Sequence, residues 1–84
     1  MRVMNKTRTM PRRETVYEFI QKIGKNLHKL RTARKESIET VSSAIKITPY
    51  LLNKIENGAY PNCKLEILFD LCDYYEIRPT SLLD

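Results

Sequence analysis

Apolar residues recur at intervals of three and four along most of the chain, the spacing of an amphipathic α-helix. The first stripe consists of Val16, Ile20, Ile23, Leu27 and Leu30. It predicts a helix over residues 14–34, which contains Gly24 at a cost of about 1 kcal/mol relative to alanine. No alternation typical of a strand is apparent, so the pattern favours an all-α fold.

Two short helices are predicted next, and each is preceded by a residue that can cap it. Ser37 precedes apolar positions at helical spacing and predicts a helix over 38–45, because its hydroxyl can accept from a backbone N–H of the first turn. Thr48 and Pro49 predict the next helix, over 49–57, since proline at the first helical position needs no N–H. Gly58 then ends that helix, because glycine tolerates the left-handed conformation.

The last third of the chain predicts one more amphipathic helix, over 64–75, and a final helical turn from Pro79 to Leu83. The total is a compact five-helix bundle in one domain. The helices over 38–45 and 49–57 are short and are joined by about three residues. Such a pair has to cross at a large angle, as in a helix-turn-helix.

From Ile23 to Leu83 the chain resembles the Cro/repressor-type helix-turn-helix family (XRE family). The segments that carry the resemblance are IGKNLHKLR at 23–31, SIETVSSAIKIT at 37–48, LLNKIENG at 51–58 and LEILFDLCDYYEIRPTSLL at 65–83. The resemblance implies a phage-repressor-like DNA-binding domain. It also implies a recognition helix in the major groove of double-stranded DNA and transcriptional regulation, usually as a homodimer.

The resemblance also implies which side chains meet DNA. At the start of the recognition helix, the residues placed near base edges are Thr48, Pro49, Tyr50, Asn53 and Lys54. Lysine can donate to guanine O6 and N7, and asparagine can pair with adenine N6 and N7. Those placed near the phosphate backbone are Ser37, Asn57 and Tyr60.

Two positions depart from the family pattern. Ile38 stands where the family often has a glutamine that contacts phosphate, and Lys46 replaces the turn glycine. A third position, Glu56, is an acid in a basic region. Its place in the family pattern implies an intramolecular ion pair, with Arg31 as the candidate partner.

Charge is spread unevenly along the chain. There are 15 Lys and Arg against 10 Asp and Glu, a net charge of +5, and residues 1–13 contain five basic residues and no acid. We expect residues 1–13 to form a flexible basic N-terminal arm and residues 14–84 the helix-turn-helix domain. In the arm, Arg8, Arg12 and Arg13 are candidate DNA contacts. The alternative is a solvated tail with no role in binding.

Other chemistry finds little support. Cys63 and Cys72 stand nine residues apart, and His28 is the single histidine, so no metal-ligand set is expected and buried thiols are favoured. No phosphate-binding loop or catalytic motif occurs, so we expect neither a cofactor nor an enzyme. The chain contains no apolar run long enough for a membrane span and no signal peptide, which indicates a cytoplasmic protein.

Two functions remain open. The first is a sequence-specific transcriptional regulator, a repressor, that reads DNA with the helix over 49–57. The second is a protein-interaction module or antitoxin-like regulator that keeps the fold with little DNA reading, which Ile38, Pro49 and Leu51 favour slightly. A homodimer is expected in the first case, because apolar residues gather near the C-terminus at Tyr74, Ile77, Leu82 and Leu83.

Overall fold

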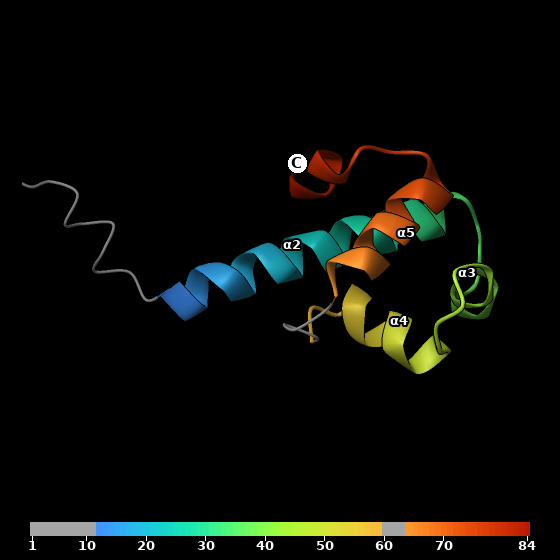
Figure 1. Cartoon of the computed structure of the whole chain (residues 1–84), viewed down its shortest axis with the longest axis horizontal. Helices are drawn as coiled ribbons and strands as arrows, with labels where there is room; N and C mark the ends of the chain where they lie inside the picture. Colours follow the sequence, from blue (N-terminus) through green and yellow to red (C-terminus); the bar gives the residue numbers. More distant parts are fainter. Residues whose placement is uncertain (1–11, 60–63) are drawn as a thin grey trace, which may run out of the picture.

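The computed structural model describes residues 12–59 and 64–84. In that part of the chain every regular element is helical (Figure 1). The elements are α2 (Arg12–Ala33), α3 (Ile38–Ala44), α4 (Pro49–Glu56), α5 (Leu65–Tyr75) and the 3₁₀-helix η1 (Pro79–Leu83). The all-α prediction is confirmed, and the last of the five expected helices is a 3₁₀ turn.

Element boundaries agree with the sequence prediction to within two residues. The largest difference is at the start of α2, which begins at Arg12 rather than at residue 14. Arg12 and Arg13, which we assigned to the arm, therefore belong to the backbone of a helix. The remaining eleven residues of the expected arm lie outside the described residues.

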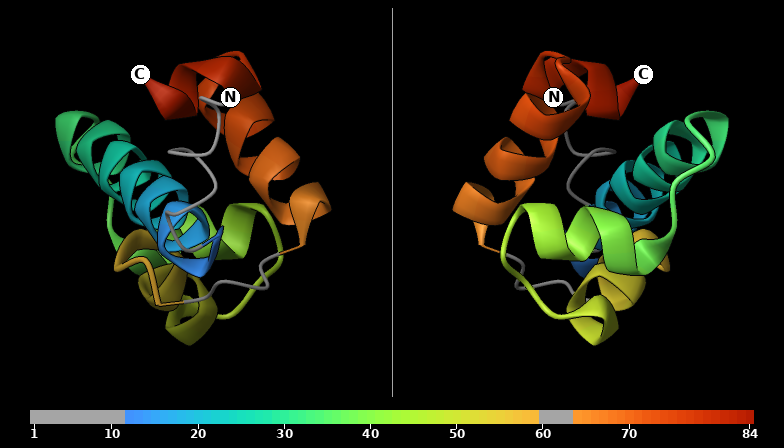
Figure 2. Two further views of the ribbon diagram at one scale, coloured as in Figure 1. Left: turned by 90° about the vertical axis from the view of Figure 1, so that its left-hand side faces the viewer. Right: turned by 90° about the vertical axis from the view of Figure 1, so that its right-hand side faces the viewer.

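The other elements gather around the second half of α2, and its first half projects beyond them (Figure 1). Helices α4 and η1 both pack against α2, and α3 packs against α4. In Figures 1 and 2, η1 lies at the top of the molecule and α4 at the bottom. No helix of the described segments is long and apolar enough to cross a bilayer.

Each of the four α-helices within residues 12–59 and 64–84 contributes a fully buried side chain to one core. Leu27 of α2, Val41 of α3, Leu52 of α4 and Leu71 of α5 all have no exposed surface. Cys72 is buried beside them, which confirms that part of the thiol prediction, and burial raises the pKa of this thiol. Cys63 lies outside the described residues.

Gly24 allows α2 and α4 to approach closely. A Cβ atom at this position would lie 2.7 Å from the carbonyl oxygen of Glu56 and would collide with that of Ile55. Real Cβ atoms do not come so close to backbone, so a larger residue would push the end of α4 away. The helix-propensity cost of this glycine is offset by the packing it permits.

The four α-helices of the described segments all end in the same hydrogen-bonded turn. After α3, Ile47 N–H donates to the Ser42 carbonyl at 3.0 Å and Lys46 N–H donates to that of Ser43 at 3.2 Å, the Schellman pattern. The left-handed position of this pattern is occupied by Lys35, Lys46, Gly58 and Glu76 in turn. The replacement of the turn glycine by Lys46 is therefore accommodated with the usual backbone, at φ 64°.

The C-terminal residues on which we based a dimer are largely used within the domain. Leu82 is 3% exposed and belongs to the core, and Ile77 and Tyr74 are partly buried against it. The Tyr74 hydroxyl also donates to Glu36 Oε2 at 2.7 Å. The prediction of spare apolar surface was wrong for these three residues. η1 folds back onto α2 and buries Leu82, whereas Tyr74 contacts Arg34 and Glu36 of the α2–α3 turn. Of the four residues, Leu83 is exposed.

Candidate nucleic-acid interface

Helices α3 and α4 each begin with the cap residue that the sequence predicted. Ser37 Oγ accepts from the Thr40 N–H at 3.0 Å, and Thr48 Oγ1 accepts from the Leu51 N–H at 3.1 Å. Pro49 occupies the first position of α4. These bonds satisfy first-turn donors that would otherwise lack partners. Both hydroxyls are therefore engaged at the helix starts, where their side chains remain exposed.

One side of α4 is buried and the other faces solvent. Leu52 and Ile55 are buried, whereas Tyr50 is 71% exposed. Further predicted site residues that the structure exposes are Thr48, Pro49, Asn53 and Asn57, and Lys54 is half-buried. The structure thus brings six of the predicted side chains together on α4 and its two caps.

Two contacts order side chains on the exposed side of α4. The Lys54 Nζ atom lies 5.3 Å from the centre of the Tyr50 ring, a cation–π distance. Asn57 Nδ2 donates to Asn53 Oδ1 at 2.8 Å. Hydrogen-bonding groups held in place before binding lose less conformational freedom when they meet a ligand. Both contacts restrict the conformations of these exposed side chains.

An ion pair fixes the position of α4 on α2. Arg31 donates to Glu56 through Nε at 2.8 Å and through Nη2 at 3.0 Å, while its Nη1 donates to the Glu36 carbonyl at 2.9 Å. The Glu56 side chain is 4% exposed. The hydrogen bond that Arg31 donates to Glu56 raises the pKa of Arg31. The predicted pair is confirmed, and Arg31 ties α4 both to α2 and to the α2–α3 turn.

His28 adds a contact that the sequence reading missed. Its Nδ1 lies 3.1 Å from Glu56 Oε1. The signal was present in the spacing, since His28 stands three residues before Arg31 and the two therefore share a face of α2. The histidine side chain is half exposed. Its contact with Glu56 joins it to the ion pair of Arg31 and Glu56.

The apolar residues of the helix pair face the core more than the surface. Ile38, at the position of the family's phosphate-contacting glutamine, is partly buried and packs against the core, as does Leu51. Isoleucine offers no side-chain hydrogen bond, so any phosphate contact at the start of α3 has to come from other groups. The other predicted contacts, Arg8 and Tyr60, lie outside the described residues, as do the side chains of Arg12 and Arg13.

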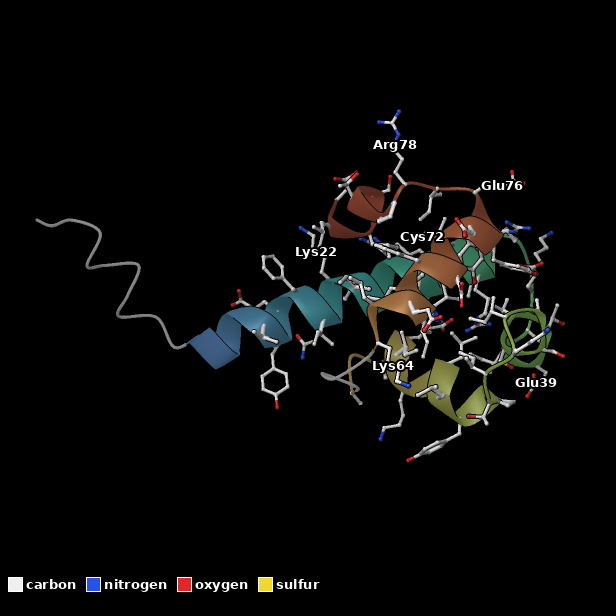
Figure 3. The ribbon with its side chains drawn as sticks, in the orientation of Figure 1. Lys22, Glu39, Lys64, Cys72, Glu76 and Arg78 are labelled. Carbon is white, nitrogen blue, oxygen red and sulfur yellow. The ribbon has the colours of Figure 1, made fainter. Side chains whose placement is uncertain are left out.

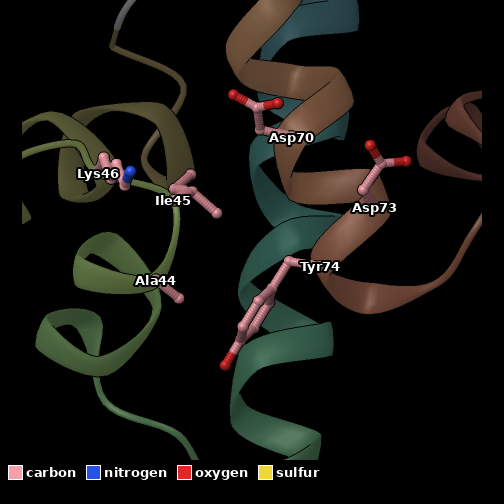
Figure 4. A pocket seen from close by; sticks show the side chains of 6 residues that line it. All are labelled: Ala44, Ile45, Lys46, Asp70, Asp73 and Tyr74. Carbon is pink, nitrogen blue, oxygen red and sulfur yellow. The ribbon is translucent and has the colours of Figure 1, made fainter.

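A hollow of about 410 Å³ opens between the α3–α4 turn and α5 (Figure 4). It is lined by Ala44, Ile45, Lys46, Asp70, Asp73 and Tyr74. Two carboxylates at this site repel a phosphate, and a single lysine does not outweigh them. The hollow is therefore unsuited to a nucleic-acid backbone, and the exposed side of α4 is the better candidate.

Comparison with known proteins assigns this arrangement of helices to a known family. The family model described as "Helix-turn-helix domain" matches residues 24–84. The fold is similar to the crystal structure of the restriction-modification controller protein C.AhdI from Aeromonas hydrophila, with a TM-score of 0.69 and 28% sequence identity. That likeness covers 75% of this chain and 94% of the other. Among curated proteins, none matches the chain.

Proposed function

The chain belongs to the helix-turn-helix domain family, and from this premise we propose that it is a sequence-specific DNA-binding transcriptional regulator. In this proposal it represses by occupying an operator as a homodimer, and it performs no chemistry. Helix α4 enters the major groove and reads bases there. The observation that carries the proposal is the exposed polar side of α4, held in place by the buried pair of Arg31 and Glu56.

Base reading is assigned to two side chains of α4. Lys54 donates to guanine O6 and N7, and Asn53 pairs with adenine N6 and N7. Tyr50 contacts a base or a phosphate beside them. The residues that we assign to the phosphate backbone are Ser37, Thr48, Asn57 and Tyr60, with Arg8, Arg12 and Arg13 of the expected arm.

The relative with a solved structure supports the regulatory part of the proposal. It is a restriction-modification controller protein, and it shares the fold over almost its whole length. The same fold with 28% identity makes transcriptional regulation the function that we favour for this chain. Because fold alone does not establish function, the site residues carry the argument.

The protein-interaction alternative loses part of its basis. It relied on Ile38, Pro49 and Leu51 as an apolar surface near the reading face. Ile38 and Leu51 instead pack against the core. Pro49 is exposed, but its place at the first position of α4 gives it a structural role.

Selection of bound duplexes from a random library tests the proposal. We expect enrichment of one sequence, arranged as a palindrome whose half-sites lie about 34 Å apart, one helical turn. Selection that enriches no sequence over several rounds would contradict base reading. An enriched single half-site would retain base reading and contradict the dimer.

A further inference from the structure

A polar hollow of about 340 Å³ lies between α2 and the end of α4. It is lined by Gln21, Lys25, His28, Glu56 and Asn57. The first three follow one another at intervals of four and three residues, so they share one face of α2. We call this space the α2–α4 hollow.

Close packing on the α4 side fixes the walls of the hollow. A Cβ atom at Gly58 would lie 2.8 Å from Gln21 Cγ and 3.0 Å from Gln21 Cα, so only glycine permits this approach. The end of α4 therefore lies directly against the middle of α2 (Figure 1). The residues of the hollow are brought together by the fold of the domain.

The carboxylate that lines the hollow is already paired. The Glu56 side chain is 4% exposed, and Arg31 donates to both of its oxygens. Lys25 and Gln21 are exposed, and neither has a hydrogen-bond or ion-pair partner within residues 12–59 and 64–84. The hollow thus presents one ammonium group whose charge the paired carboxylate does not cancel.

The surroundings of the hollow are also basic. Lys29 follows Lys25 by one turn of α2, and Lys54 adds a positive charge on α4. The acid Glu18 lies about 10 Å from Lys25 along the helix axis. It precedes Lys22 by four residues, the spacing of an ion pair within a helix. The net charge around the hollow is positive, which favours an anion.

The hollow borders the exposed side of α4. Asn57 lines the hollow and also donates to Asn53 on that side. Helix α4 has eight residues and is about 12 Å long, and the major groove of DNA is about 12 Å wide. If the first turn of α4 meets base edges, its last turn reaches the edge of the groove, where the phosphates lie.

We propose that the α2–α4 hollow holds one phosphate of the DNA backbone. A phosphodiester carries one negative charge and only acceptor oxygens. It is matched by the Lys25 ammonium and by the amide donors of Gln21 and Asn57. The inference rests on the proposed function for its DNA, and it adds α2 to the contact surface. Because α2 is packed rigidly on α4, this contact would set how α4 lies in the groove.

The salt dependence of DNA binding by the full chain tests the inference. In Lys25→Ala, the slope of log affinity against log salt should become shallower by about 0.9, the loss of one phosphate contact. The dissociation constant should rise about fivefold to tenfold at 0.1 M salt. Fluorescence anisotropy with a labelled duplex measures both quantities.

Lys22→Ala is the matched control. Lys22 is an exposed lysine on the same helix, on the side toward η1 and away from α4 (Figure 3). Its replacement should leave the slope nearly unchanged. Thermal unfolding should show that both variants retain the fold, because both side chains are exposed. An equal effect of the two variants would indicate a loss of overall charge and would overturn the site.

Neutral methylphosphonate groups, placed one at a time in the selected duplex, locate the phosphate. At one position and its symmetry mate, the replacement should weaken binding by the parent chain and have little further effect on Lys25→Ala. A parent that prefers the selected sequence, but has no position coupled to Lys25, would overturn this inference and leave the proposed function intact. A Lys25-dependent slope on duplexes among which the parent shows no preference would uphold the phosphate site and reject base reading. A chain that binds no duplex would overturn both.

Discussion

Three helix ends place a side chain where glycine is usual. Lys35, Lys46 and Glu76 all have φ between 56° and 64°. The left-handed conformation costs a non-glycine residue roughly 1–2 kcal/mol. Only the turn at Lys46 was identified from the sequence, through the family pattern. At Lys35 and Glu76, no feature of the sequence predicts the left-handed conformation.

Lys46→Gly should therefore raise the free energy of unfolding by about 0.5–1 kcal/mol. Glycine removes the strain but adds freedom to the unfolded chain, so the gain is smaller than the strain. Urea unfolding measures it. The matched control is Lys29→Gly, at an exposed position inside α2, which should lose about 1 kcal/mol. A loss at both positions would contradict the account of the turn.

Tyr75 is a second residue with a measurable consequence. Burial, with smaller contributions from Glu56 and Glu36, raises its pKa from 10.0 to about 12. The folded chain thus keeps this proton where the unfolded chain loses it. The contribution of Tyr75 to stability is unaffected below pH 10 and falls between pH 10 and 12, by up to about 1.4 kcal/mol per pH unit.

Tyr75→Phe should remove that alkaline loss. Its hydroxyl is buried and has no hydrogen-bond partner in the described part of the chain, so phenylalanine breaks no such bond. Urea midpoints between pH 9 and 12 measure the effect, with Tyr50→Phe as the exposed control. An identical alkaline loss in both variants would refute the assignment to Tyr75.

At the scale of elements, periodicity and caps were sufficient to predict the helices. Ser37 and Thr48 marked the starts of α3 and α4 because capping is a local interaction. What escaped prediction depends on contacts between elements. The burial of Leu82 requires η1 to fold back onto α2, and His28 joins Glu56 only because α4 packs at Gly24. The first contact has no local signature, and the second has only the three-residue spacing of His28 from Arg31.

The pair of Arg31 and Glu56 should be the strongest tie between α2 and α4. Arg31→Ala leaves a buried carboxylate with its main partner removed, and we expect a loss of about 3–5 kcal/mol in unfolding free energy. Lys29→Ala, exposed on the same helix, should change stability by less than about 0.5 kcal/mol. The combined change Arg31→Met and Glu56→Leu should cost less than Arg31→Ala. A larger cost for the combined change would argue against a buried-charge penalty.

Base reading belongs to the exposed side of α4. Asn53→Ala and Lys54→Ala should each cost about 1–3 kcal/mol on the selected site and relax preference at one base position. Fluorescence anisotropy on single-base variants of the site measures both effects. Arg78→Ala is the control, because Arg78 lies at the top of the molecule, away from α4 (Figure 3). Unchanged base preference in both α4 variants would mean that another surface reads the bases.

At the scale of the whole molecule, the N-terminal residues differ from the domain in charge: residues 1–13 contain basic residues and no acid. Removal of residues 1–11 takes away three basic residues and leaves α2 intact from Arg12. If these charges lie along phosphates, the slope of log affinity against log salt becomes shallower by at most about 2.7. Thermal stability should hardly change. An unchanged slope would support the solvated tail.

The central claim is that this chain distinguishes one DNA sequence from others through α4. The most direct measurement compares its dissociation constants for the selected duplex and for a scrambled duplex of equal length, at one physiological salt concentration. We predict a ratio of at least about 10³, as is usual for specific binding. The chain with both Asn53→Ala and Lys54→Ala should lose most of that ratio. Equal affinity of the parent chain for the two duplexes would contradict the claim.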